Sequence, residues 1–333
     1  MNPFKAQDDK QSWVVGVGSA LVDILTHEED EFLARIGTLK GGMTLVDKAF
    51  IDDTLDVSRN LPTYVPGGSA CNTAVGVGRL GGRARFVGKC GNGGLGKLFR
   101  QDLEKQNVQP RLIDSDEPTG RCLSVITPDS QRSMFTFLGA SAQAQPEEIE
   151  AHYFHGAAVA HVEGYLLHNP ELLEAALATA KQAGAHVSLD LASFNVVAEA
   201  LPALTRLVED YVDILIANED EAEAFTGEAD EMKALAALGE KAPLAALKVG
   251  ARGSFLIHQG EVTTVAPRAG ATPVDTTGAG DLWAAGFLYG LVHGYPFEKC
   301  GALASACGYE VCQVVGANIP DAGWDRIKKS VEA

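Results

Sequence analysis

The sequence predicts a doubly wound α/β domain, in which helices flank a mostly parallel sheet, and two observations lead to this expectation. First, stretches typical of strands alternate with stretches typical of helices through the second half of the chain. The expected strands are 157–162, 186–191 and 212–217, and the expected helices are 170–183, 196–208 and 219–225. Second, no internal repeat or disordered linker divides the 333 residues. Because strands separated by helices form parallel crossovers, one domain over 1–333 is the simplest arrangement.

The charge balance of the chain disfavours several classes of partner. Its 27 basic and 44 acidic residues give a formal net charge of −17. This charge argues against unaided binding to nucleic acid or to an anionic membrane. No apolar run approaches the roughly 18 residues of a membrane-spanning helix, and the N-terminal stretch lacks the apolar segment of a signal peptide. Together with six scattered cysteines, these features predict a cytoplasmic protein.

The first expected strand is 13–18, and the loop after it carries Asp23. Open α/β sheets bind ligands beyond the carboxyl ends of their strands, so Asp23 is a candidate binding residue. Gly16 and Gly18 are spaced like the start of a dinucleotide fingerprint, but Leu21 occupies the position of its third glycine. A dinucleotide-binding fold is therefore not expected. The next expected elements are a helix at 29–36, a strand at 44–46 and a helix at 48–55.

Gly67 and Gly68 precede a helix that is expected over 69–80, with Ser69 as its N-cap. Two glycines allow a ligand to approach the backbone closely, and Asn72 would present its amide from the first turn. The alternative is a helix-starting turn in which Asn72 is only structural.

Two antiparallel strands are expected over 119–126 and 132–138, because they flank a turn at 128–131. An antiparallel pair that interrupts a pattern of alternating strands and helices is a candidate flap over a binding site. Further upstream, 91–97 follows most of the Walker A pattern. Leu98 stands where that motif needs Ser or Thr, so we assign the segment to an ordinary helix after the strand 83–90.

Asn218 and Glu221 follow the strand that ends at 217, where they would meet a ligand at the edge of the sheet. The alternative is that these residues form only the favourable acidic first turn of a helix. Farther along, Lys248, Gly250 and Gly253 lie between two apolar runs, and the glycines mark a turn between strands.

The stretch 275–281 reads Asp-Thr-Thr-Gly-Ala-Gly-Asp and leads directly into an apolar helix. Its glycines allow a tight turn, so the N–H groups of Gly278, Ala279 and Gly280 would converge at the positive end of the helix dipole. An anion would be stabilised there, and Asp281 in the first turn could accept a proton from an attacking hydroxyl. The alternative is that the two aspartates serve only as a turn residue and a dipole partner.

The stretch 275–281 resembles a signature of the ribokinase-like (PfkB) family of carbohydrate and nucleoside kinases. A second signature of this family matches 67–74, far upstream and in the right order. The resemblance implies a single kinase domain with a small β-lid, to which segments at about 40–66 and 116–140 would contribute. It also implies an enzyme that uses ATP and Mg²⁺ to phosphorylate a primary hydroxyl of a sugar or of a nucleoside ribose.

The resemblance further implies roles for individual residues. Asp281 would be the general base, and Gly278, Ala279 and Gly280 would form an anion hole. The residues expected to bind the acceptor are Asp23, Gly67, Gly68, Asn72 and, as part of an apolar slot for a base, Phe137. The residues expected to line the nucleotide site are Asn218, Lys248, Gly250, Gly253, Asp275 and Thr277. Glu221 and Asn218 would place Mg²⁺ through water, and a monovalent cation such as K⁺ could bind near Asp275 and 316–318.

Three further stretches, 40–47, 132–140 and 163–166, look like the adenosine-kinase-like bacterial branch of the family. Two stretches depart from the family pattern. Thr is usual where this chain has Lys248 or Val249, which leaves the role of Lys248 open. A Ser-Asp-Pro-Phe type of sequence is expected at 190–194, and its absence weakens what the branch says about the substrate. A sugar or sugar-phosphate kinase is the alternative, and a non-catalytic nucleoside sensor is a third. An apolar slot would favour a nucleoside, whereas an Arg or Lys aimed at a second phosphate would favour a sugar phosphate. The expected state is a monomer or a homodimer.

Overall fold

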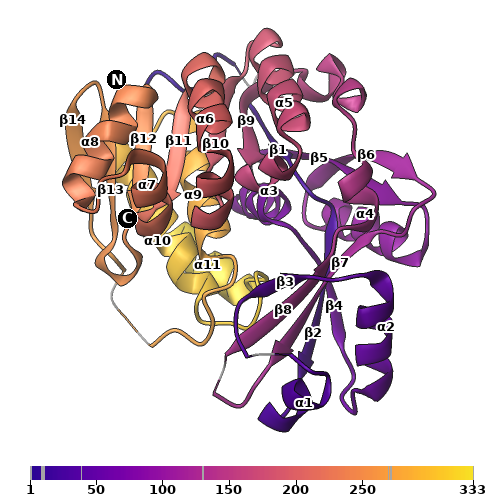
Figure 1. Ribbon diagram of the computed structural model, residues 1–333. Coiled ribbons are helices and arrows are strands. Elements are labelled where there is room, and N and C mark those ends of the chain that lie inside the picture. The colour runs from indigo at the N-terminus through magenta and orange to yellow at the C-terminus, as the bar shows by residue number, and fades with distance from the viewer. Residues whose placement is uncertain are drawn as a thin grey trace.

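A computed structural model of the chain describes residues 2–8, 12–38, 40–129, 131–268, 270 and 272–332. The described residues form two sheets, one of nine strands and one of five. Figure 1 shows the large sheet with helices on both faces, and the small sheet at one end of the molecule. The predicted α/β fold with a mostly parallel, doubly wound sheet is confirmed. Ser130, in the turn expected at 128–131, lies outside the described residues.

The large sheet follows the order β14-β13-β12-β11-β10-β9-β1-β5-β6 in the described structure. Its strands are β1 (Trp13–Val17), β5 (Arg83–Gly91), β6 (Val108–Ser115), β9 (Ala157–Glu163), β10 (His186–Asp190), β11 (Ile214–Asn218), β12 (Leu244–Lys248), β13 (Ser254–His258) and β14 (Glu261–Val265). In this spatial order, all neighbours between β12 and β6 are parallel. In contrast, β13 is antiparallel to β12, and β14 is antiparallel to β13. The sequence did not predict β6, which contains Pro110. As an edge strand, β6 tolerates the missing N–H.

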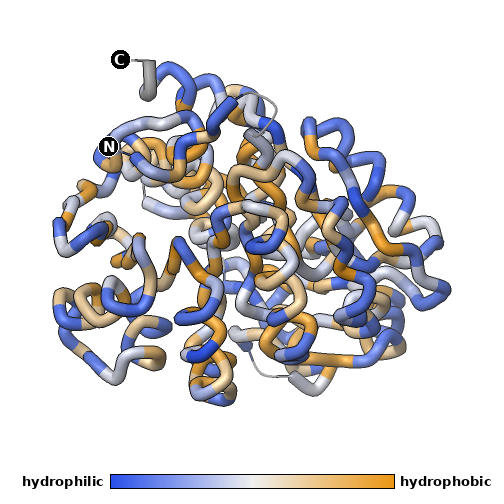
Figure 2. The backbone as a smooth tube through the Cα atoms, turned by 90° about the horizontal axis from the view of Figure 1, so that it is seen from above, coloured by the Kyte–Doolittle hydropathy of each residue, from blue (hydrophilic) through white to orange (hydrophobic). Residues whose placement is uncertain are grey.

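Helices cover both faces of the large sheet and create two apolar cores. One core includes residues of α5 (Pro170–Gln182), α6 (Phe194–Tyr211), α7 (Glu219–Thr226) and α8 (Glu231–Lys241). The other includes residues of α3 (Ser69–Leu80), α4 (Gly94–Lys105), α9 (Ala279–Val292) and α10 (Phe297–Val311), and α11 (Asp321–Glu332) packs against α10. In β1, Val14 belongs to the second core and Val15 to the first, because alternate side chains of a strand point to opposite faces. Figure 2 shows hydrophobic segments in the interior and hydrophilic segments along the periphery.

The small sheet has the order β3-β8-β7-β2-β4. Its strands are β2 (Leu21–His27), β3 (Met43–Leu45), β4 (Thr63–Gly67), β7 (Gly120–Ile126) and β8 (Arg132–Phe137). The expected antiparallel pairing of β7 with β8 is confirmed. One face packs on α1 (Asp30–Arg35) and α2 (Lys48–Val57) through Ile24, Leu123 and Phe135.

Asp23 corrects one expectation, since it lies on β2 rather than in a loop of the large sheet. Its neighbours alternate between buried and half-buried side chains, as they do in a strand with one covered face.

Candidate active site

A cavity of about 600 Å³ lies between the carboxyl edge of the large sheet, the start of α9 and the small sheet. Nine of the residues expected at the site line it: Asp23, Gly68, Asn218, Glu221, Lys248, Thr277, Gly278, Gly280 and Asp281. Seven other expected residues are not among those that line it: Gly67, Asn72, Phe137, Gly250, Gly253, Asp275 and Ala279. The structure therefore brings segments from both sheets together around one space.

The loop before α9 offers backbone N–H groups to this cavity. Gly278 is the N-cap of α9 with φ of 73°, and a Cβ there would lie 2.6 Å from the Cβ of Ala317, so glycine is required. The N–H of Ala279 donates to the carbonyl of Thr276 at 3.1 Å. Among the described residues, the N–H groups of Gly278 and Gly280 have no acceptor. Two N–H groups and the helix dipole are thus available to an anion.

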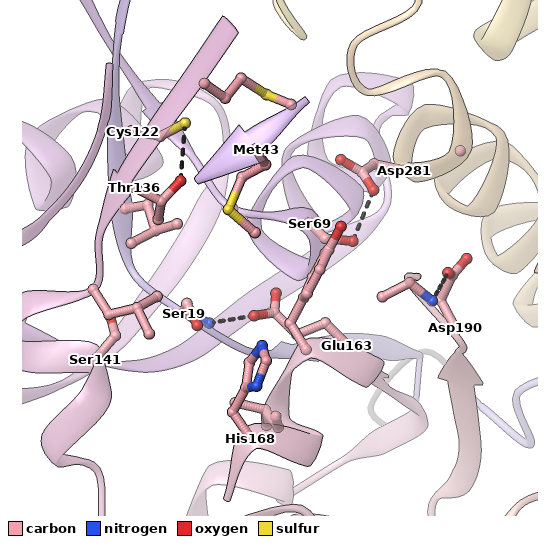
Figure 3. A pocket seen from close by; sticks show the side chains of 18 of the residues that line it. Ser19, Met43, Ser69, Cys122, Thr136, Ser141, Glu163, His168, Asp190 and Asp281 are labelled. Atoms are coloured by element: carbon pink, nitrogen blue, oxygen red, sulfur yellow. Dashed lines mark hydrogen bonds between the residues drawn. The ribbon is translucent and has the colours of Figure 1, made fainter. Parts of the chain in front are cut away.

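Asp281, in the first turn of α9, is hydrogen-bonded to three residues of α3. Ser69 Oγ donates to Oδ1 at 2.7 Å, and Asn72 Nδ2 donates to Oδ2 at 2.8 Å (Figure 3 shows the first contact). Thr73 Oγ1 donates to the carbonyl oxygen of Asp281 at 3.1 Å. Burial raises the pKa of Asp281, and the bonds from Asn72 and Ser69 partly offset that rise. The two motifs of the sequence therefore meet at one carboxylate.

Ser69 corrects a second expectation. The N-cap of α3 is Gly68, with φ of 95°, and Ser69 is the first residue inside the helix. Its hydroxyl bonds Asp281 instead of a backbone N–H of its own helix. Asn72, expected to contact the acceptor, is 9% exposed and orients Asp281 from behind the cavity wall.

Asp23 lines the cavity from β2. Burial raises the pKa of Asp23 to about 7, although the Arg132 guanidinium lowers it and Asp281 raises it further. A Cβ at position 67 would overlap the Asp23 carboxylate, which explains the glycine there. Gly67 thus shapes the site without lining it.

Glu163, at the end of β9, is a site residue that the sequence did not predict. Its carboxylate accepts hydrogen bonds from the N–H of Ser19 at 2.8 Å and of Ala70 at 3.0 Å (Figure 3 shows the Ser19 bond). It is 1% exposed, and burial raises its pKa to about 7. A glutamate that directly follows an apolar strand at the ligand-binding edge was the available signal.

Asn218 and Glu221 form a capping box at the start of α7. Glu221 Oε2 accepts from the N–H of Asn218 at 2.8 Å and Oε1 from its Nδ2 at 2.8 Å. Burial raises the pKa of Glu221 to about 7. The described residues contain no group of three or more His, Cys, Asp or Glu side chains able to hold a metal ion. One or two carboxylates fit Mg²⁺, which takes its other ligands from phosphates and water.

Lys248, at the end of β12, forms a buried ion pair with Asp190, at the end of β10. Lys248 Nζ lies 2.8 Å from Asp190 Oδ2, and the side chains are 14% and 9% exposed. Burial lowers the pKa of Lys248, but the charges of Asp190 and Glu221 outweigh this effect, so the net shift is upward. Asp190 was missed because the residues after it depart from the family pattern.

Gly250 and Gly253 do mark the turn after β12, with φ of 54° and 102°. Gly250 is exposed and Gly253 half-buried.

Arg132, at the start of β8, connects the small sheet to the loop before α9. Its Nη2 lies 2.5 Å from Asp275 Oδ2, and both side chains are at most 8% exposed. Asp275 also accepts from the N–H of Gly316 at 2.7 Å and from the N–H and hydroxyl of Thr277 at 3.1 and 3.0 Å. Asp275 is therefore a structural centre of this loop, set back from the cavity.

The cavity wall that the small sheet provides is mainly apolar. It includes Met43, Leu45, Met134, Thr136 and Leu138. Because side chains alternate along β8, Phe137 points to the opposite face, where it packs with the cluster beneath α1 and α2. Contrary to expectation, Phe137 does not line the cavity, whereas the neighbouring Leu138 does. Figure 3 shows Met43 and His168 on opposite sides of the space.

Comparisons with known proteins agree with this geometry. The model of the pfkB family of carbohydrate kinases matches residues 49–322. Ribokinase from Arabidopsis thaliana is 30% identical over 96% of this chain and 82% of its own length. The crystal structure of adenosine kinase from Sinorhizobium meliloti has a TM-score of 0.86 and 32% identity, covering 97% of this chain and 99% of that one. A probable sugar kinase from Rhizobium etli has a TM-score of 0.88 and 32% identity, covering 96% and 98%. No described helix is long and apolar enough to cross a membrane.

Proposed function

Because this chain belongs to the pfkB family of carbohydrate kinases, we propose that it transfers the terminal phosphoryl group of ATP to the primary hydroxyl of a nucleoside ribose. The observation that carries the proposal is the position of Asp281. This half-buried carboxylate lies beside the two free N–H groups of the anion loop and lines the same cavity as Asp23. A base and an anion site next to each other suit an attack on phosphorus.

In this proposal, Asp23 and the backbone at Gly68 bind the acceptor, and Asp281 takes the proton from its hydroxyl. The N–H groups of Gly278 and Gly280 stabilise the charge on the transferred phosphoryl. Asn218 and Glu221 face the phosphates, where they would place Mg²⁺ through water. The metal ion, when bound, neutralises phosphate charge.

The walls of the cavity favour a nucleoside over a phosphorylated sugar. Met43, Met134 and Leu138 give the acceptor side an apolar surface, and methionines adapt well to a flat base. Among the described residues that line the cavity, Lys248 is the one Lys or Arg, and it lies on the phosphate side. No cation of the lining is thus aimed at a second phosphate on the acceptor. A sugar kinase is the second candidate, because the Asp23 carboxylate can bind the vicinal hydroxyls of a free sugar as well as those of a ribose.

The test is ATP consumption, with Mg²⁺, against adenosine, inosine, ribose, fructose and fructose phosphates. We expect the highest kcat/KM with a nucleoside. Turnover of a free sugar without turnover of any nucleoside would favour the second candidate. Binding of nucleosides without any ATP consumption would contradict the kinase proposal and favour a sensor.

Further features belong to the same proposal. The small sheet would act as a lid that excludes water, with segments 40–66 and 116–140 contributing and β2 as a part that the sequence did not predict. A K⁺ ion near Asp275 would have to share a carboxylate that already meets Arg132 and Gly316, and the dependence of turnover on KCl tests this. The free cysteines and the use of ATP suit the cytoplasm. A monomer or homodimer is the proposed state.

A further inference from the structure

We propose that Lys248 is a further catalytic residue, whose ammonium group donates to the phosphoryl group during its transfer, and that Asp190 positions it. This inference rests on the proposed kinase function. It assigns to Lys248 a task that differs from lining the nucleotide pocket, and it gives Asp190 a role that the motifs of the chain did not suggest.

The sheet topology places Lys248 at the reaction centre. The neighbouring parallel strands β10, β11 and β12 end with Asp190, Asn218 and Lys248, and Asn218 pairs in register with Lys248. All three side chains line the cavity. A Cβ at position 280 would lie 3.2 Å from Lys248 Nζ, so the ammonium group packs directly against the anion loop. The glycine at 280 leaves room for this contact.

The charges around Lys248 keep it protonated. The carboxylates that face it are Asp190 from β10, Glu221 from α7 and Asp281 from α9, and each of them raises its pKa against the effect of burial. The buried His161, on β9, is near the same ion pair, but burial lowers its pKa to about 4, which leaves it neutral at pH 7. Lys248 therefore brings a full positive charge to a site of low dielectric, where a charge acts strongly.

Asp190 is fixed in a way that suits a positioning residue. Its Oδ2 meets Lys248, while its Oδ1 accepts from the N–H of Ala192 at 2.9 Å. Ala192 has φ of 64°, an uncommon conformation for a residue other than glycine, so this turn is held by its surroundings. A buried ion pair is weak evidence for stability, because desolvation costs about as much as the attraction returns. A role in the reaction explains why the pair lies in the cavity.

The step to which Lys248 contributes is a balanced transfer. The acceptor oxygen bonds to the terminal phosphorus while its proton passes to Asp281. The bond between that phosphorus and the bridging oxygen breaks, and its electron pair stays on ADP. Charge is spread over the three other oxygens of the phosphoryl group. Gly278 and Gly280 donate N–H groups to these oxygens, and Lys248 donates a third, charged hydrogen bond without losing its proton.

The experiment compares Lys248→Met, Asp190→Asn and the double variant with the wild type, using the acceptor found in the screen. Lys181→Met is the matched control. Lys181 also pairs with an aspartate, Asp213, but this residue lies just before β11, at the amino ends of the parallel strands. Two quantities are measured: kcat at saturating ATP and Mg²⁺, and the calorimetric affinity for ADP with and without fluoroaluminate, a mimic of the transferred phosphoryl. Thermal unfolding of each variant checks that it folds.

For Lys248→Met we expect kcat to fall by about 100-fold to 1,000-fold, as for the loss of one preorganised donor. ADP alone should bind nearly as before, but the gain in affinity from fluoroaluminate should disappear. The double variant should be as slow as Lys248→Met. If the pair is only structural, removing both charges should restore kcat and the fluoroaluminate effect, and that result would overturn the proposal.

The outcome also separates this inference from the proposed function. A wild type that turns over no acceptor overturns the kinase proposal, and this inference with it. An active wild type with an equally active Lys248→Met overturns the inference alone.

Discussion

The two sides of the cavity are built on different principles. On the phosphate side, charged and polar groups at strand ends and at the start of α9 are hydrogen-bonded to one another, as in the contacts of Asp281 and of Glu221. On the acceptor side, the small sheet contributes apolar side chains such as Met43 and Met134, which make few directed contacts. Directed contacts fix the chemistry, whereas an adaptable wall sets which acceptor fits. Changes on the phosphate side should therefore alter kcat, and changes on the acceptor side should alter KM.

The largest effect should come from Asp281→Asn. Removing the base should lower kcat by at least about 100-fold, while ATP binding stays largely intact. Kinetics with the best acceptor and calorimetry with ATP measure the two quantities. Glu298→Gln is the control, since Glu298 is also an acidic residue in the first turn of a helix, α10, but is exposed. Equal turnover in Asp281→Asn and wild type would contradict the proposed base.

The next effect should come from Ser69→Ala. The Ser69 hydroxyl lowers the pKa of Asp281, so its loss should raise that pKa. A base must be deprotonated to act, and the acidic limb of the kcat profile should therefore move to higher pH, with a loss of kcat below the new midpoint. Thr73→Val removes a bond to the backbone carbonyl of Asp281 only, and should leave the midpoint in place. The same midpoint in Ser69→Ala and wild type would contradict this prediction.

A smaller effect should come from Met134→Ala on the acceptor side. Losing this contact should raise KM for a nucleoside by about 10-fold, in line with a few lost methylene contacts, and should change kcat little. KM for ATP should not move. Met232→Ala, at an exposed position on α8, is the control. A large drop in kcat with unchanged KM for the nucleoside would contradict the prediction that the acceptor side controls KM.

The smallest effect concerns stability. Burial raises the pKa of Glu163 from its ordinary value of 4.5 to about 7, so the folded state binds this proton more tightly than the unfolded chain. Stability from this group is present below pH 4.5 and is lost as pH rises through 7. Glu163→Gln should therefore be more stable, relative to wild type, at pH 8 than at pH 5, as measured by thermal unfolding. The same difference in Tm at both pH values would contradict the shift.

The sequence predicted the fold well, and it also suggested candidates for the phosphate side of the site, because both signals are local. The motif at 275–281 and the pair Asn218 and Glu221 are each contiguous or nearly so. The acceptor side depends on the register of strands. A shift of one residue decides that Thr136 faces the cavity and Phe137 does not, and no local pattern separated the two.

The missed residues belong to stretches to which the sequence assigned no role at the site. The partners of Glu163, Asp190 and Arg132 are set by the order of strands and by the approach of the small sheet. Ser69 was misread for a related reason. Its local context is that of a helix cap, and the partner that binds its hydroxyl is 212 residues away.

That distance also bears on how the protein comes together during synthesis. The helix that carries Ser69 and Asn72 leaves the ribosome long before α9, and contacts between distant segments form slowly. Gly76 packs closely on Ala285 and Leu282, so the two helices meet without space for larger side chains. The active centre is therefore completed last. A chain divided at the exposed loop 227–230 should give two inactive pieces whose reunion restores turnover, making the molecule a natural template for a split-protein reporter.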